Sequence, residues 1–276
     1  MLYLHRRPAP PLDAFVEAIW FCRSEPRPHA LERVLPSGSA QLIINLAEDQ
    51  TRMYDSTARG LVCRIAPGSV LSGVSTRYQI IDTAETQHVA GIVFRPGGTL
   101  PFVVPPASEL SNLDVPLECI CGAATTRKLR EQLLAAPRPD AALNLLERWL
   151  AAAFRERACH PAVTFALQQF HGEPSVARIA AVKNAIGLSP KRFIERFKAE
   201  IGVTPKRYCR LLRFQRAVKI AHAGTPLDWA QLALECGYFD QAHFIHEFRE
   251  FSGLTPSAYQ AATTSFQNHV TFLQSN

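Results

Sequence analysis

Basic side chains gather in one short stretch of the chain, where ten Lys or Arg residues between Ser189 and Lys219 stand against only two Glu residues. The ten bases are Lys191, Arg192, Arg196, Lys198, Lys206, Arg207, Arg210, Arg213, Arg216 and Lys219. Ammonium and guanidinium groups neutralise phosphates, and arginine also pairs with the edge of guanine. The whole 276-residue chain carries +6 at a pI near 9.1. This concentration of charge favours a nucleic-acid partner, although a helical bundle with solvated Lys and Arg would carry the same charge.

An internal repeat surrounds the basic stretch. Phe193–Lys198 returns 51 residues later as Phe244–Arg249, and Gly202–Pro205 returns at the same offset as Gly253–Pro256. A repeat at a constant offset predicts two units of the same architecture.

Each copy of the repeat carries start and stop signals for helices. Ser189-Pro190 supplies an N-cap followed by proline at the first helical position, and Gly202 ends that helix. Thr204-Pro205 starts the next helix by the same means. The pairs Pro174-Ser175 and Thr225-Pro226 are expected to open an earlier short helix in each copy. These earlier helices would end at the glycine turns Gly187 and Gly237.

A short helix, a glycine turn and a second helix with an apolar inner face form the helix-turn-helix layout, whose second helix enters the major groove of DNA. The predicted DNA-contacting residues of the first copy are Ser189, Lys191, Arg192, Ile194, Glu195, Arg196, Lys206 and Arg207. Those of the second copy are Asp240, Gln241, Ala242, Ile245 and His246. Arg and Lys suit guanine, Gln suits adenine, Glu suits cytosine, and small apolar groups suit the thymine methyl.

One long helix is expected between the copies, from Pro205 to about Ala223. Its inward residues would be Leu211, Leu212, Phe214, Ala217, Val218 and Ile220, and its outward residues Arg210, Arg213, Arg216 and Lys219. If the two second helices enter successive major grooves, they lie roughly 34 Å apart, so a monomer could engage DNA. Ala233, Tyr238 and Phe239 are expected to pack inside the second motif.

The first hundred residues predict a small β domain. Leu42–Leu46, Arg77–Ile81 and Val89–Phe94 are short β-branched runs bounded by turn residues. Three Pro- and Gly-containing segments are expected to be turns between strands, namely residues 36–39, 67–69 and 96–98.

Residues 108–158 change to helical spacing, with two helices separated by Pro137 and Pro139. We expect this pair to pack against the β domain, with a dimer surface as the alternative. Residues 159–173 then form a helix or linker.

About 100 residues of the C-terminal region closely resemble the DNA-binding domain of the AraC family of bacterial transcription regulators. The more specific match is the second copy, where Leu232-Ala233, Cys236–Phe244, Phe248-Arg249 and Gly253–Pro256 follow the signature of that family. The resemblance implies a seven-helix, two-motif domain on DNA. The first copy departs from the pattern in two ways. Its first helix is about three residues longer than is usual for this role, and Glu195 stands where arginine is common.

The N-terminal region also resembles, more weakly, the first domain of one subgroup of this family. The resemblance rests on Arg33–Gly38 with Leu42–Leu46 and on Phe94–Gly98, and it implies a β-rich regulatory or sensor domain. We therefore expect an α+β protein: a small β-barrel-like or cupin-like domain with flanking helices over 1–158, an all-α double helix-turn-helix domain over 159–262, and a polar tail over 263–276.

Enzymatic chemistry finds no support in the sequence, and no catalytic residue, metal site or cofactor is predicted. Cys119 and Cys121 could supply only two of the four ligands of a structural zinc site. We therefore expect them to be buried cysteines in apolar surroundings. The alternative is a DNA-associated thiol- or metal-responsive sensor or repair protein, but Cys22 and Cys63 alone cannot supply the four-cysteine cluster that such repair proteins carry.

One further candidate is Arg95, next to Pro96-Gly97-Gly98, which could hold an anionic ligand or else pair with Asp82 or Glu85. The partners expected are double-stranded DNA first, then a small-molecule effector, a second copy of the chain, and RNA polymerase if the protein is an activator. The seven scattered cysteines and the absence of an apolar stretch of roughly 18 to 20 residues favour a cytoplasmic protein without a membrane contact.

Overall fold

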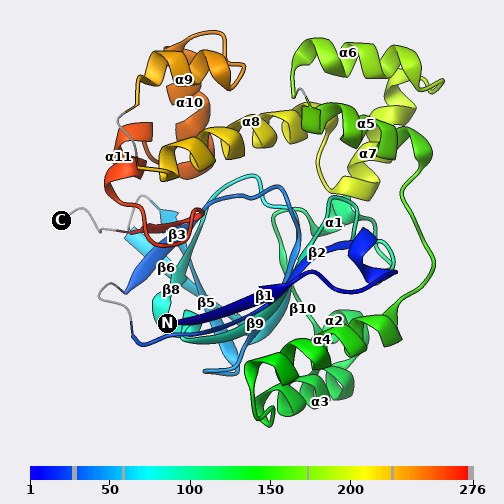
Figure 1. Cartoon of the computed structure of the whole chain (residues 1–276), viewed down its shortest axis with the longest axis vertical. Coiled ribbons are helices and arrows are strands. Elements are labelled where there is room, and N and C mark those ends of the chain that lie inside the picture. Colours follow the sequence, from blue (N-terminus) through cyan, green and yellow to red (C-terminus); the bar gives the residue numbers. More distant parts are fainter. Residues whose placement is uncertain (27–29, 58–59, 173, 225–226, 273–276) are drawn as a thin grey trace.

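The computed structural model describes residues 1–26, 30–57, 60–172, 174–224 and 227–272. Two β-sheets occupy the N-terminal part, and helices from the C-terminal part lie across them (Figure 1). The apolar core continues from the sheets into these helices.

The first sheet is antiparallel and has six strands in the order β1-β2-β9-β4-β7-β10. Their bounds are β1 Leu2–Arg6, β2 Val16–Arg23, β4 Gln41–Asn45, β7 Ser69–Ser72, β9 His88–Phe94 and β10 Asp114–Pro116. The central strands β9 and β4 are apolar on both faces, since both faces are covered. Gly91 in β9 is required by the close approach of the Trp20 ring, which would lie 2.5 Å from an added Cβ.

The second sheet has five strands in the order β11-β3-β8-β5-β6. Their bounds are β3 Leu31–Val34, β5 Gln50–Thr57, β6 Gly60–Pro67, β8 Gln79–Asp82 and β11 His269–Thr271. Strand β11 comes from the far end of the chain and pairs antiparallel with β3. Part of the segment that was expected as a polar tail is therefore an edge strand of the N-terminal sheet.

The two sheets do not close into a barrel. The expected β-rich domain is confirmed, and it consists of two antiparallel sheets rather than a closed barrel. Each sheet ends in edge strands, β1 and β10 in the first and β11 and β6 in the second. The turns expected at 36–39 and 67–69 connect strands, whereas residues 96–98 follow β9 and lead toward helix α1, Ala107–Leu110.

A helical pair packs against the first sheet, as expected. Helix α4, Pro139–Ala153, contacts β1, β2 and β9 through its buried face, and α3, Ala123–Leu134, packs on α4. Arg6 of β1 donates to Glu147 of α4, which fixes the helix on the sheet. The short elements η1 (Leu12–Ala14), η2 (Thr83–Thr86) and α2 (Glu118–Cys121) complete this part.

Within the described residues, seven helices form the C-terminal domain. They are α5 Pro161–Gly172, α6 Val176–Ala185, α7 Pro190–Ile201, α8 Pro205–His222, α9 Trp229–Glu235, α10 Gln241–Ser252 and α11 Pro256–Ala261. Helix α8 runs between two helical lobes, with α5 to α7 at one end and α9 to α11 at the other (Figure 1). The long central helix is thus confirmed, and residues 161–172 are helical rather than a linker.

The second copy of the repeat starts later than expected. Residues 225–226 lie outside the described part of the chain, and α9 begins at Trp229 with Asp228 as its N-cap. The Asp228 carboxylate accepts hydrogen bonds from the backbone N–H groups of Ala230 and Gln231, at 2.8 and 3.2 Å. Helix α6, in contrast, begins after the Ser175 cap as expected.

Contacts between the two parts of the chain are extensive. The Gln215 amide of α8 donates to the Pro36 carbonyl and to the Asn268 side chain, at 2.8 and 3.0 Å. Gly202, which ends α7 at a φ of +97°, lies against Val74 and Ala107, so a side chain there would be strained and crowded. The N-terminal part therefore contacts the helical domain at the end of α7 and along α8.

Glu85 gives the N-terminal domain a measurable pH dependence. This carboxylate is 5% exposed and accepts from the Arg52 backbone N–H, and burial raises its pKa from 4.5 to about 7. Because the folded state holds the proton more tightly, Glu85 stabilises the fold at low pH and loses this contribution as the pH rises from 4.5 through 7. We expect the free energy of unfolding of Glu85→Gln, relative to wild type, to rise by about 2 kcal/mol between pH 5 and pH 8. Parallel stability curves in urea titrations would contradict this assignment.

Candidate nucleic-acid interface

The two predicted DNA-contacting helices, α7 and α10, begin with matching caps. The Ser189 hydroxyl accepts from the Arg192 N–H at 3.4 Å, and the Asp240 carboxylate accepts from the His243 N–H at 2.7 Å. A glycine with positive φ precedes each cap, at +65° for Gly187 and +79° for Gly237. The helix, glycine turn and helix order is therefore present in both copies. Ser189 and Asp240, expected as DNA contacts, lie at the helix ends that a recognition helix directs toward DNA.

Aromatic side chains fix the inner face of both helices. Phe193 and Phe197 of α7 and Phe244 and Phe248 of α10 are fully buried. Phe248 lies 5.2 Å from the ring of Phe214 on α8, in an edge-to-face contact. This packing decides which residues of each helix face solvent.

The outer faces carry the predicted DNA contacts. On α7 the exposed residues are Lys191, Arg192, Glu195 and Arg196, and Ile194 is partly buried. On α10 the exposed residues are Gln241, Ala242 and His246, and Ile245 is partly buried. The structure thus presents a set of hydrogen-bond donors and small apolar groups on each helix, as the repeat predicts.

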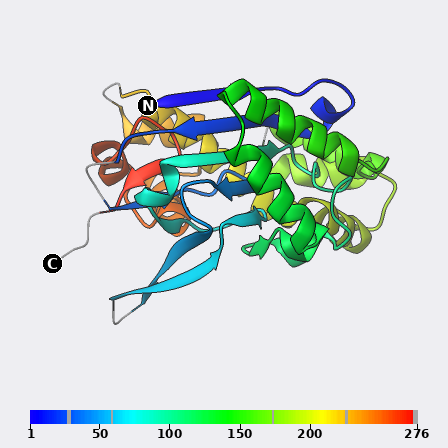
Figure 2. The same ribbon diagram turned by 90° about the horizontal axis from the view of Figure 1, so that it is seen from below.

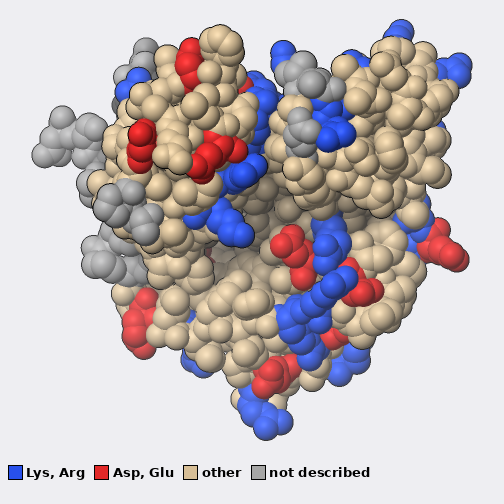
Figure 3. Space-filling model, turned by 45° about the horizontal axis from the view of Figure 1, so that its top comes forward, with Lys and Arg blue, Asp and Glu red and all other residues tan. Residues whose placement is uncertain are grey.

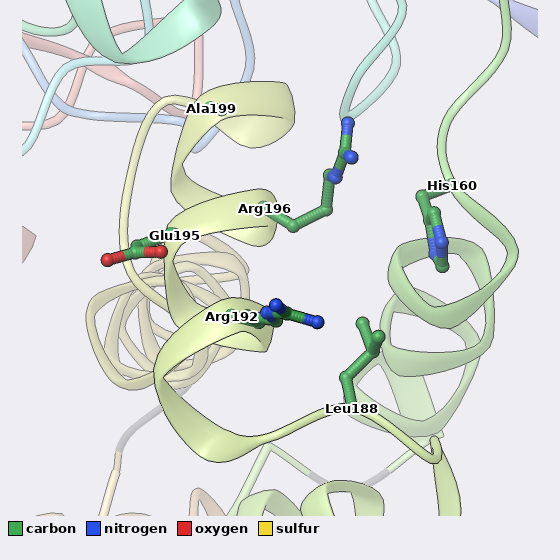
Figure 4. Close-up of a pocket in the computed structure, with 6 residues that line it drawn as sticks. All are labelled: His160, Leu188, Arg192, Glu195, Arg196 and Ala199. Atoms are coloured by element: carbon green, nitrogen blue, oxygen red, sulfur yellow. The ribbon is translucent and has the colours of Figure 1, made fainter.

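A groove beside α7 brings three cationic or polar donors together (Figure 4). It has a volume of about 510 Å³ and is lined by His160, Leu188, Arg192, Glu195, Arg196 and Ala199. His160 accepts from the Ala162 N–H through Nδ1, at 3.1 Å, so its neutral form carries hydrogen on Nε2. Figure 4 shows Glu195 on the side of the helix away from His160. His160 was not predicted from the sequence, because it lies directly before α5, outside the repeat, and reaches this groove only through the packing of α5 beside α7.

Two arginines of α8 differ from the expected outward orientation. Arg213 is 7% exposed and pairs with Glu247 at 3.3 Å, while Arg210 pairs with Glu247 at 2.6 Å and also with Glu250. The expectation that Arg210 and Arg213 face outward is therefore wrong for Arg213 and only partly right for Arg210. Their partners lie on α10, about 40 residues away in the sequence.

Arg207, predicted to contact DNA, is also engaged within the chain. Its guanidinium pairs with Glu250, donates to the Thr76 carbonyl at 2.9 Å and lies 4.5 Å from the Phe251 ring. It joins α8 to α10 and to the N-terminal domain. Lys206, its neighbour, is exposed.

The remaining positive charge lies at the surface. Figure 3 shows Lys and Arg side chains along the hollow between the two helical lobes. Within the described residues, six bases of the basic stretch are exposed and have no carboxylate partner. They are Lys191, Arg192, Lys198, Lys206, Arg216 and Lys219. With ten bases and two acids, the stretch has a net charge of +8. Part of this charge is neutralised by carboxylates of α10, and the rest is available to an acidic partner.

Phe239 contradicts its expected place in the core. Tyr238 and Ala233 are buried, at 3% and 0% exposure, whereas Phe239 is 85% exposed directly before the Asp240 cap. Only one aromatic side chain of the pair can point inward at this turn, and Tyr238 packs against Phe244 at 5.1 Å.

Arg95 pairs with neither Asp82 nor Glu85, which corrects that alternative. Its Nε donates to the Asp13 carbonyl at 3.0 Å. The cavity that it lines together with Gly97 and Glu200 has a volume of about 10 Å³, enough for one water molecule and far below the size of a ligand site.

The cysteines differ in exposure and in the pKa of their thiols. Cys119 is exposed and Cys121 is half-buried, so the expectation that both are buried is wrong. Burial raises the pKa of Cys159 and Cys209 to about 12 and that of Cys236 to about 11, so these thiols stay protonated. Among the described residues, no three His, Cys, Asp or Glu side chains are grouped so that they could hold a metal ion. The same residues contain no helix that is long and apolar enough to span a bilayer.

Comparison with known proteins agrees with this geometry. Residues 183–262 match the family described as "Helix-turn-helix domain", and residues 4–116 match "Domain of unknown function (DUF6597)". A protein of Haemophilus influenzae, named "Uncharacterized HTH-type transcriptional regulator", is 28% identical over 121 residues, which are 44% of this chain and 39% of that protein. The match thus spans well under half the length of this relative.

Solved structures that resemble parts or most of this chain include the following two. The C-terminal domain of AraT, a response regulator from Geobacillus stearothermophilus, is 21% identical at a TM-score of 0.35, covering 38% of this chain and 88% of that one. ToxT from Vibrio cholerae is 9% identical at a TM-score of 0.47, covering 95% of this chain and 97% of that one. By its double motif and these matches, the chain contains a helix-turn-helix domain over residues 183–262 and a DUF6597 domain over residues 4–116.

Proposed function

We propose that this protein binds specific sites in double-stranded DNA through α7 and α10 and thereby regulates transcription. The observation that carries the proposal is the pair of similarly capped helices whose aromatic faces are buried and whose polar faces are exposed. Such a helix can place its first turns against base edges in the major groove. Selection of bound sequences from a random DNA pool tests the proposal directly, and enrichment of no sequence would contradict it.

The exposed residues fall into two roles. Arg192 and Gln241 lie in the first turn of their helices, where they can form paired hydrogen bonds with guanine and adenine. Lys206, at the start of α8, is a single charge suited to a phosphate. The groove between α5 and α7 adds His160 as a second donor suited to the backbone.

These two roles predict different losses of DNA affinity when the residues are replaced. Arg192→Ala or Gln241→Ala should weaken binding to the selected site by about 1 to 3 kcal/mol and relax the preference at one base position. Lys206→Ala should weaken binding to all DNA sequences by a similar amount. It should also reduce the slope of log affinity against log salt concentration by about 1. Fluorescence anisotropy across a salt series on selected and scrambled duplexes measures both. Lys128→Ala, an exposed base on α3, is the control and should change neither.

Equal losses for every variant on every duplex would contradict the division into base and phosphate contacts. A loss that is confined to the selected duplex for Lys206→Ala would do the same.

The sheets are proposed as the regulatory part of the protein. Helix α8 contacts loops between their strands at two places, through Arg207 to Thr76 near its start and through Gln215 to Pro36 near its middle. A small effector or partner that shifts these contacts would change the geometry of the two motifs, as would contact with RNA polymerase for an activator. We also propose that the protein acts in the cytoplasm as a non-enzymatic regulator. Gln215→Ala tests whether the contact of α8 with the N-terminal part alters DNA affinity.

A further inference from the structure

The β5–β6 hairpin extends away from the rest of the molecule (Figure 2). Strand β6 pairs with β5 from Thr57↔Gly60 to Gln50↔Pro67, whereas β8 pairs with β5 only at Met53 and Tyr54. No other described strand pairs with β6, which is the last strand of its sheet. One side of β6 is therefore an open edge.

The register fixes which backbone groups point outward from this edge. Only two residues connect Thr57 to Gly60, so that pair must be of the hydrogen-bonded kind. Hydrogen-bonded pairs alternate along an antiparallel ladder. Consequently Val62, Arg64 and Ala66 bond to β5, and the N–H and C=O groups of Leu61, Cys63 and Ile65 point away from it.

Two independent features agree with this alternation. The Arg52 N–H lies opposite Ile65 and donates to Glu85, on the side of β5 away from β6. Pro67, which lacks an N–H, falls at an outward position, where proline is tolerated in an edge strand.

The side chains along the edge are apolar and exposed. Val62 is 52% exposed, Ile65 is 68% exposed, and Cys63 between them is also exposed. An apolar edge strand with unpaired backbone groups is a template for strand addition unless charge or proline blocks it. The one charged side chain here, Arg64, pairs with Asp55 at 2.5 Å.

We propose that a second copy of this chain adds to the sheet through β6, antiparallel, with the two-fold axis at Cys63. In this arrangement Cys63 faces the partner's Cys63, and Leu61 faces the partner's Ile65. All three outward residues then meet outward residues, so the pairing completes a hydrogen-bonded ladder across the axis.

The axis at Cys63 keeps the edge self-complementary and avoids two conflicts that arise farther along β6. Moving the axis to Ile65 sets Cys63 opposite the partner's Pro67, which has no N–H to donate. Charge is also compatible, since Arg64 faces the partner's Val62 rather than another arginine. Each copy brings its own Asp55–Arg64 pair, so these side chains add no net charge to the interface.

The test uses the full chain without DNA, so its outcome is independent of the proposed function. Sedimentation velocity should give a species of twice 30.6 kDa for the wild type. Cys63→Arg sets two guanidinium groups opposite each other at the axis and should raise the dissociation constant at least tenfold. Cys119→Arg makes the same change at another exposed cysteine and should leave the dimer intact.

Cross-linking provides a second measurement that does not depend on the folding of a variant. In Cys119→Ser protein, a short bis-maleimide should join Cys63 to the partner's Cys63, as identified by mass spectrometry of the peptides. The proposal is overturned by a wild type that is monomeric at all concentrations, by a Cys63→Arg protein that dimerises as the wild type does, or by cross-links that omit Cys63.

Discussion

Replacing Phe248 by Asp is expected to unfold the second helix-turn-helix motif. Phe248 is fully buried, and its ring contacts those of Phe214, Phe244 and Tyr259 at 5.2 to 5.7 Å between centroids. Loss of such a side chain costs about 3 to 5 kcal/mol, and an unpaired carboxylate in the same space adds to that. The sum approaches the whole stability of a typical domain, about 5 to 15 kcal/mol.

Phe239→Asp is the matched control, because it makes the same change in the same motif at a side chain that is 85% exposed. Its free energy of unfolding should stay within about 0.5 kcal/mol of the wild type. Urea titrations followed by circular dichroism measure both variants. A Phe248→Asp protein that keeps its melting temperature would show that α10 is not packed as described.

The repeat could be predicted from sequence because its signals are local. The Ser189 cap, the Phe193 and Phe197 spacing and the Gly202 end all act within one helix and its neighbours. Burial then follows from the apolar face alone, so the exposed residues of α7 could be assigned without knowledge of the fold.

The ion pairs of α8 could not be predicted in the same way. Helical periodicity places Arg210 and Arg213 on the polar side, but their environment is set by Glu247, which comes from α10. A run of basic residues in the sequence gives only the number of basic groups. How many of them stay unpaired depends on which carboxylates the fold brings next to them. Phe239 could not be placed from the sequence for the same reason. Of the neighbours Tyr238 and Phe239, the one that turns inward is decided by packing against α10.

Strand positions were predictable, but closure and pairing of the sheets were not. Leu42–Leu46 and Val89–Phe94 overlap β4 and β9 because β-branched runs between turns are a local signal. The partner of β3 is a three-residue strand over 200 residues later, His269–Thr271, and no local pattern marks it. Its pairing depends on where α11 ends, which is a property of the helical domain.

Removal of the Glu247 carboxylate is expected to weaken the link between the two motifs. Arg213 uses one guanidinium nitrogen for Glu247 on α10 and another for the Pro174 carbonyl before α6, at 3.3 and 3.5 Å. Glu247→Ala leaves this buried cation without its counter-charge, which typically costs 3 to 5 kcal/mol, on the order of the Phe248 effect. Affinity for DNA with both half-sites should fall more than affinity for one half-site, because the spacing of the motifs is no longer fixed.

Glu250→Ala is the control, since Glu250 contacts Arg207 and Arg210 from the same helix but at the surface, with 36% side-chain exposure. It should cost no more than about 1 kcal/mol. The double variant Arg213→Met with Glu247→Leu separates two causes: it should recover much of the stability lost in Glu247→Ala, because no buried charge is left unpaired. If the double variant is as unstable as Glu247→Ala, the loss comes from packing rather than from the buried cation, and Glu247 is then not the counter-charge that holds the motifs in place.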